Sequence, residues 1–230
     1  KLQKLIFQNA SHELRTPLAV MQTNLEVFAR KKTPTIEEYQ DIFGMIQNQT
    51  ERLSHLSEVL LDMTGIQSVE RSDFISLAEL TDEVCCDLAS IADQKKVELI
   101  QEEGDCTVTG SYLLLYRAVY NLVENAIKYN HSGGKVTVKI SQKKDLPAAH
   151  SKPADYALVE VTDTGIGISP EFQEKIFDPF FRVDKSRSRA MGGAGLGLAL
   201  VNEIARQHGG QVKVLASSEQ GSTIALVLPI

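Results

Sequence analysis

Aromatic side chains are scarce in this sequence of 230 residues: they make up 6% of it, and tryptophan is absent. No apolar run approaches the roughly 20 residues that a membrane-spanning helix requires, and no stretch has the residue order of a signal peptide. The chain opens at Lys1, without a methionine and already inside a helical pattern. We therefore expect a fragment of a longer protein.

Cysteine and positive charge are also in short supply. The adjacent Cys85 and Cys86 and the isolated Cys106 have a spacing that fits neither a disulfide framework nor a metal site. Reduced thiols are typical of a cytosolic compartment. The net charge of −6 disfavours nucleic acid and an anionic membrane surface as main partners, since both select a basic face. The 43% of hydrophobic residues is enough for a sizeable core.

Residues 1–67 have the period of long helices. Apolar residues alternate at spacings of four and three along two segments, which are separated by a polar turn around Pro34. The positions are Leu14, Leu18, Met21, Leu25 and Phe28, then Ile42, Ile46, Gln49, Leu53, Leu56, Leu60 and Met63. This pattern predicts a helical hairpin. Two helices cannot fully shield their apolar stripes, so we expect two hairpins to form a four-helix bundle, and hence a homodimer.

Residues 68–230 show a different pattern. Short runs rich in β-branched residues, such as 136–140, 156–161 and 223–228, alternate with helical stretches near 79–94, 111–129 and 196–208. Mixed strands and helices of this kind predict an α/β sandwich with helices layered on one face of a sheet. The expected class of the whole chain is therefore α+β.

A polar stripe marks the predicted helix over 111–129. Asn121, Asn125 and Lys128 fall at i, i+4 and i+7, and therefore share one face. An amide oxygen can ligate Mg²⁺, and an ammonium group can hold a phosphate. The alternative is a solvated helix face with no ligand.

A second motif, residues 163–168, directly follows an apolar strand. Gly165 and Gly167 would let the backbone approach a flat ligand closely, and Asp163 could accept a hydrogen bond from an adenine amino group. On its own, this motif could equally be a turn.

Two further motifs follow. Residues 177–182 are rich in phenylalanine and end at Arg182, and a glycine-rich run over 192–197 leads into a helix. Glycines before a helix N-terminus make an anion site from free backbone N–H groups and the helix dipole. The segment between these motifs is basic, as a lid over a triphosphate should be.

The order of these four motifs resembles the ATP-binding domain of histidine kinases, a fold shared with DNA gyrase, mismatch-repair and heat-shock-chaperone ATPases. The resemblance implies ATP as ligand, Asn125 as Mg²⁺ ligand, Asp163 on the adenine and Arg182 near the transferring phosphate. It further implies a nucleotide site that includes Asn121, Lys128, Tyr129, Gly165, Gly167, Gly193, Gly195, Leu196, Gly197 and Thr223. Ala194 departs from the family, which usually has threonine there.

The first predicted helix carries His12-Glu13-Leu14-Arg15-Thr16-Pro17. His12 lies about 200° around the helix from Leu14, and so points away from the apolar seam. Glu13 could accept or orient the imidazole proton. A lone surface histidine is the alternative. Thr16, one turn beyond His12, could hold a water that attacks an aspartyl phosphate, which predicts a regulator phosphatase activity.

This segment closely resembles the phosphoacceptor box of sensor histidine kinases. The resemblance implies His12 as phosphoacceptor, later transfer to an aspartate of a response regulator receiver domain, and a full-length protein in the cell membrane with this portion in the cytoplasm. A water-hydrolysing ATPase is a rival reading. However, the gyrase-like family places a catalytic glutamate where Asn121 stands, and an amide cannot act as a base. A non-enzymatic scaffold is the remaining alternative.

Overall fold

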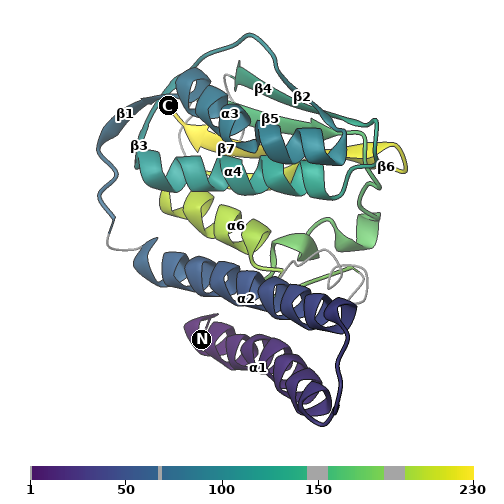
Figure 1. Ribbon diagram of the computed structural model, residues 1–230. Coiled ribbons are helices and arrows are strands. Elements are labelled where there is room, and N and C mark those ends of the chain that lie inside the picture. The colour runs from purple at the N-terminus through teal and green to yellow at the C-terminus, as the bar shows by residue number, and fades with distance from the viewer. Residues whose placement is uncertain (1, 67–68, 144–154, 184–194) are drawn as a thin grey trace.

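The computed structural model describes residues 2–66, 69–143, 155–183 and 195–230. Helices α1 (Leu2–Ala29) and α2 (Ile36–Gly65) form an antiparallel hairpin, and a layered α/β part follows (Figure 1). The predicted α+β class is confirmed. The predicted boundary between residues 67 and 68 lies outside the described residues.

The α/β part contains seven strands and three long helices among the described residues. The strands are β1 (Asp73–Ser76), β2 (Glu98–Gln101), β3 (Thr107–Gly110), β4 (Lys135–Lys143), β5 (Tyr156–Asp163), β6 (Gln211–Ser218) and β7 (Gly221–Pro229). The helices are α3 (Leu77–Lys95), α4 (Tyr112–Lys128) and α6 (Gly197–Gln207), with the short 3₁₀ turns η2 (Pro170–Phe172) and η3 (Lys175–Phe177) before α6.

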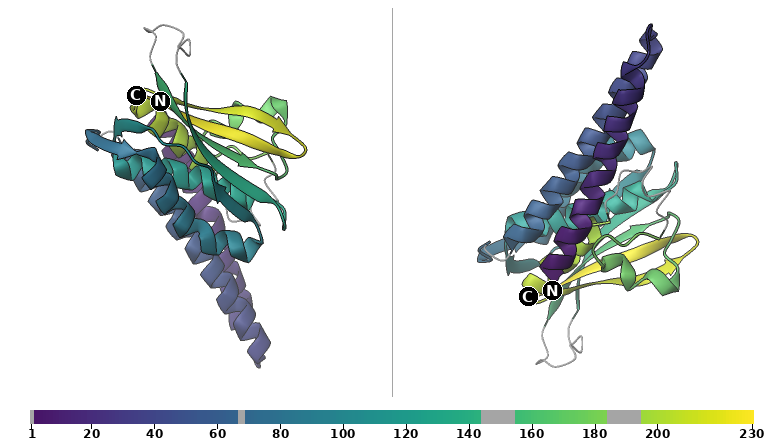
Figure 2. Two further views of the ribbon diagram at one scale, coloured as in Figure 1. Left: turned by 90° about the horizontal axis from the view of Figure 1, so that it is seen from above. Right: turned by 90° about the horizontal axis from the view of Figure 1, so that it is seen from below.

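One mixed sheet carries the domain. Its strand order is β2-β4-β5-β7-β6, with β2 parallel to β4 and the other neighbours antiparallel, while β1 and β3 form a separate two-stranded ribbon. Helices α3, α4 and α6 cover one face of the large sheet (Figures 1 and 2). Serine side chains begin two of these helices: Ser76 accepts from the amide of Glu79, and Ser111 from that of Leu114.

The hairpin packs against the α/β part. Leu56 and Val59 of α2 are buried in the same apolar cluster as Leu200 and Ile204 of α6, and Ala10 of α1 is 4% exposed. Helix α6 therefore lies between α4 and α2 (Figure 1). The turn end of the hairpin projects beyond the α/β part (Figure 2).

Part of the predicted seam remains open to solvent in the single chain, since Leu18 and Leu25 of α1 are 52% and 45% exposed. Phe43 of α2, which is not a seam position, is 67% exposed. Within the hairpin, Phe28 meets Tyr39 edge to face, with ring centroids 5.0 Å apart. In the described part of the chain, no helix combines the length and the apolar character that a bilayer crossing demands.

Candidate active site

The polar face of α4 is as the sequence predicted. Asn121, Asn125 and Lys128 are half-buried, while Leu122 and Val123 on the other side of the helix are buried in the core. The Asn121 side chain is fixed by a hydrogen bond from its Nδ2 to the carbonyl of Arg117 at 2.8 Å.

Lys128 carries the charge of this face. Burial lowers its pKa most, the nearby Glu124 carboxylate raises it, and the positive charges of Arg182 and Lys95 lower it further. Lys95 also donates from its Nζ to the backbone carbonyl of Lys128. Cationic groups from three segments therefore gather at the C-terminal end of α4, where an anion would relieve their mutual repulsion.

The N-terminus of α6 adjoins the two asparagines. A Cβ added to Gly197, the first residue of α6, would lie 2.6 Å from Asn121 Oδ1 and 3.6 Å from Asn125 Nδ2. Leu196 stands at the N-cap and has no side-chain oxygen to accept from the first amide groups, and the first turn holds no acidic residue. The first N–H groups and the positive end of the dipole therefore adjoin a polar amide surface, which suits a phosphate chain.

Asp163 ends β5 with both carboxylate oxygens engaged. Oδ1 accepts from the amide of Gly165 at 2.8 Å, and Oδ2 accepts from the hydroxyl of Ser222 at 2.6 Å. The backbone around it is closely packed, because a Cβ on Gly165 would lie 2.4 Å from the Tyr129 carbonyl oxygen. The carboxylate is thereby held in one orientation at the edge of the sheet.

The sequence prediction named Thr223 for this site, but the structure brings its neighbour to Asp163. Ser222 is the cross-strand partner of Asp163, whereas the Thr223 hydroxyl lies 3.0 Å from that of Thr162. Adjacent residues of a strand point to opposite faces of the sheet, so Ser222 and Thr223 cannot both face the carboxylate.

A buried asparagine that the sequence prediction missed supports the loop after Asp163. Asn130, 7% exposed, donates to the carbonyl of Lys135 at 2.9 Å and accepts from the hydroxyl of Thr164 at 3.2 Å. The network joins the end of α4 to this loop. A polar residue one position beyond Tyr129, the C-cap of an apolar helix, was the only available signal.

The Phe-rich segment, residues 177–182, closes against the start of α6. Phe180 has a positive φ of 66°, and its amide donates to the carbonyl of Gly195 at 2.7 Å. Gly195 has φ of 71°, and a Cβ there would meet the Phe181 carbonyl oxygen at 2.7 Å. Gly193, also predicted for the site, lies outside the described residues.

The phosphoacceptor helix meets this segment through one carboxylate. Glu13 Oε2 lies 3.2 Å from Arg52 Nη2 of α2 and 3.5 Å from Arg182 Nη2 of the Phe-rich segment. The Arg182 side chain is 6% exposed and Glu13 is 24% exposed, so the ion pairs are partly shielded from water. The backbone of His12 precedes Glu13 in α1, and its side chain lies outside what the structure describes.

These contacts connect the predicted nucleotide site with the predicted phosphoacceptor helix. Arg182 influences Lys128 electrostatically and bonds Glu13 directly, so one guanidinium connects the phosphate side of α4 with the helix that bears His12. Thr16, one turn beyond, is half-buried on the same helix. Among the described residues, no cluster of three or more histidine, cysteine or acidic side chains is arranged to hold a metal ion.

Comparisons with known proteins agree with this geometry. Residues 110–230 match the family model of the histidine kinase-, DNA gyrase B- and HSP90-like ATPases, and residues 2–68 match the His Kinase A (phospho-acceptor) domain. The sensor histidine kinase RppB of Synechocystis sp. is 32% identical over 99% of this chain and 49% of its own length. The chain spans about half the length of the curated relatives it matches.

Solved structures share the fold. The histidine kinase AdeS of Acinetobacter baumannii aligns with a TM-score of 0.68 at 22% identity, over 95% of this chain and 97% of that one. The histidine kinase ThkA, solved in complex with the response regulator protein TrrA, aligns with a TM-score of 0.69 at 22% identity, over 95% of this chain and 59% of that one. The chain therefore belongs to the sensor histidine kinases of two-component systems.

Proposed function

We propose that this chain binds ATP with Mg²⁺, transfers the γ-phosphoryl group to its own His12, and passes it to an aspartate of a response regulator. The observation that carries the proposal is the contact of Arg182 with Glu13 at 3.5 Å. It puts a cation from the phosphate side of the ATPase domain beside the residue that follows His12.

ATP would lie between the edge of the sheet and the start of α6. The fixed carboxylate of Asp163 can accept a hydrogen bond from the adenine amino group. The phosphates would lie at the N-terminus of α6, with Lys128 beside them. Tyr129, Gly165 and Gly167 would line the base, and Gly193, Gly195 and Leu196 the phosphate loop.

The amide side chains of Asn121 and Asn125 fit a magnesium ion, because hard oxygen ligands beside a phosphate chain are what Mg²⁺ prefers. When bound, the ion would neutralise charge on the triphosphate. Asn125 is the proposed Mg²⁺ ligand. Asn121, whose side chain is fixed by its hydrogen bond to the Arg117 carbonyl, would help to keep the groups around the ion in place.

Phosphoryl transfer then requires a neutral imidazole and a place for its proton. A ring nitrogen of His12 forms the bond to the γ-phosphorus while the bond to the bridging oxygen of ADP breaks. Glu13 takes the imidazole proton, and Arg182 stabilises the charge of the transferring group. Positioning and electrostatics supply most of the acceleration in such reactions.

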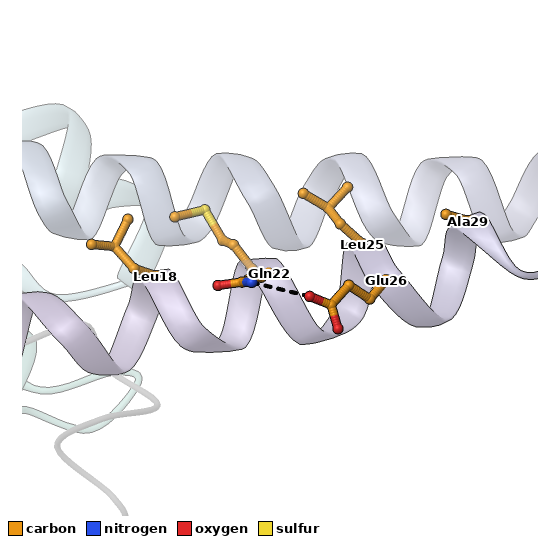
Figure 3. A pocket seen from close by; sticks show the side chains of 6 residues that line it. Leu18, Gln22, Leu25, Glu26 and Ala29 are labelled. Atoms are coloured by element: carbon orange, nitrogen blue, oxygen red, sulfur yellow. Dashed lines mark hydrogen bonds between the residues drawn. The ribbon is translucent and has the colours of Figure 1, made fainter.

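The open apolar stripe of α1 supports a homodimer. Leu18, Met21, Leu25 and Ala29 line a groove along α1, with Gln22 bonded to Glu26 at 3.0 Å on its edge (Figure 3). A second hairpin would bury these side chains in a four-helix bundle.

We place the chain in the cytoplasm, attached to the membrane only through other segments of a longer protein.

A response regulator would approach the exposed side of α1. The neighbour ThkA has been solved with the response regulator TrrA, which supports the same class of partner here. Ala19 and Thr23, seven and eleven residues after His12, are exposed and small. Thr16 is proposed to position a water for dephosphorylation of the regulator.

Incubation of the purified chain with radiolabelled Mg-ATP tests the proposal. A histidine kinase retains label on the protein in an acid-labile, base-stable form, and loses it in His12→Gln. Release of free phosphate without protein label would instead support a water-hydrolysing ATPase, and neither signal would indicate a scaffold.

A further inference from the structure

We propose that Arg52 of α2 is the positioning residue for the Glu13 carboxylate during phosphorylation of His12. This inference rests on the proposed function, since it assumes that Glu13 accepts the imidazole proton. No motif of the sequence marks Arg52, which lies 39 positions from Glu13 and meets it only because the hairpin folds back.

The contact is close and shielded. Arg52 Nη2 donates to Glu13 Oε2 at 3.2 Å, and the two side chains are 12% and 24% exposed. A guanidinium is always charged, and its planar arrangement of N–H donors holds a carboxylate in a defined orientation. Partial burial strengthens the pair relative to a surface ion pair.

Glu13 needs such a partner because of its place in the helix. Consecutive side chains of a helix point about 100° apart. A glutamate side chain therefore reaches the histidine before it only in some of its rotamers, and a fixed partner is needed to select them. Both guanidinium contacts of Glu13 fall on Oε2. Oε1 is then the oxygen that the proposal assigns to accept the proton of His12.

Arg182 cannot hold the Glu13 carboxylate in place throughout the reaction. It belongs to the ATPase domain, and its contact with Glu13 is longer, 3.5 Å. When Arg182 turns to the transferring phosphate, Glu13 loses that cation. Arg52 stays, because α1 and α2 belong to one hairpin. Among the residues that the structure describes, Glu13 forms ion pairs with these two arginines, one from α2 and one from the Phe-rich segment.

The test compares Arg52→Gln and Arg52→Lys with the wild-type chain in autophosphorylation with Mg-ATP. We expect Arg52→Gln to lower kcat about 10- to 100-fold with little change in KM for ATP, since a misplaced proton acceptor affects only the transfer step. Arg52→Lys should recover part of the rate.

Lys31→Gln is the matched control. Lys31 pairs with Glu38 at 2.5 Å across the turn of the same hairpin, far from Glu13, so its loss removes an ion pair without touching the site. It should phosphorylate as wild type. Thermal unfolding of each variant separates loss of fold from loss of rate.

An unchanged kcat in Arg52→Gln would overturn the role. So would a loss of rate that lysine does not recover, or one in which KM for ATP changes as much as kcat, since either result indicates a purely structural contact. Either result, with the wild type normally labelled, leaves the proposed function standing. A wild type that takes up no phosphate on His12 refutes the proposed function itself, and Arg52's role with it.

Discussion

Replacement of Gly197 by alanine should separate nucleotide binding from stability. The new Cβ would lie 2.6 Å from Asn121 Oδ1, whereas ordinary contact begins at 3.4 Å. The two groups must therefore separate by about 0.8 Å, because repulsion rises steeply below van der Waals contact. Either the Asn121 amide rotates or the start of α6 moves away from α4.

The effects on stability nearly cancel. Alanine in place of a helical glycine stabilises by up to about 1 kcal/mol. Rotation of the Asn121 amide breaks its 2.8 Å bond to the Arg117 carbonyl, and a lost hydrogen bond of this kind costs about 1 kcal/mol. We expect the free energy of unfolding to stay within about 1 kcal/mol of wild type.

The affinity for nucleotide should fall in Gly197→Ala. The first amide groups of α6 are proposed to bind the phosphates, and Asn121 is proposed to lie beside the magnesium ion. Displacement of the helix start and rotation of the Asn121 amide would therefore each disturb the bound Mg-ATP. The expected loss of affinity for Mg-ATP is about 10- to 100-fold, or roughly 1.4–2.8 kcal/mol. Titration with a fluorescent ATP analogue measures affinity, and thermal unfolding without nucleotide measures stability.

Gly44→Ala is the control for helix propensity. Gly44 lies in α2, and an added Cβ there meets nothing within 4 Å. It should stabilise the chain without weakening nucleotide binding. Wild-type affinity in Gly197→Ala would show that the contact between Asn121 and the start of α6 does not belong to the Mg-ATP site, and would refute the reasoning.

Further predictions concern pH, the regulator and dephosphorylation. Burial lowers the pKa of His208 below its usual 6.5, and its Nε2 accepts from the Ser111 amide at 3.1 Å. The unfolded chain therefore binds more protons, so the stability from neutral His208 is complete above pH 6.5 and is lost as pH falls below it. Urea unfolding should show a slope of at most about 1.4 kcal/mol per pH unit, absent in His208→Gln, and an equal slope in both would contradict this. Ala19→Arg should block transfer to the regulator while His12 still labels, and equal loss of both would indicate a disrupted bundle. Thr16→Ala should keep labelling and transfer but slow regulator dephosphorylation about tenfold or more, and an unchanged rate with purified phosphorylated regulator would eliminate the water-positioning role.

Local patterns predicted the elements and the polar face of α4. A helical period decides which residues share a face, so Asn121, Asn125 and Lys128 were placed together before any tertiary contact was known. Similarly, a carboxylate between an apolar strand and alternating glycines placed Asp163 at the end of a strand. In both cases the signal lies within a few residues of the site.

Contacts between distant segments had no such signal. Arg52 is one polar residue in an amphipathic helix, and its meeting with Glu13 depends on the length and hand of the hairpin turn. The pairing of Ser222 with Asp163 depends on strand register, since a shift of one residue exchanges the two faces of the sheet. Asn130 acts through backbone groups that only the folded loop brings within reach.

The central claim is that the nucleotide site phosphorylates His12 itself. The direct measurement is fragmentation mass spectrometry, under conditions that preserve phosphohistidine, of the chain after incubation with Mg-ATP. We predict one phosphoryl group on His12, absent in His12→Gln and strongly reduced in Asn125→Asp. Phosphate on another residue, or a wild-type level in His12→Gln, would contradict the account.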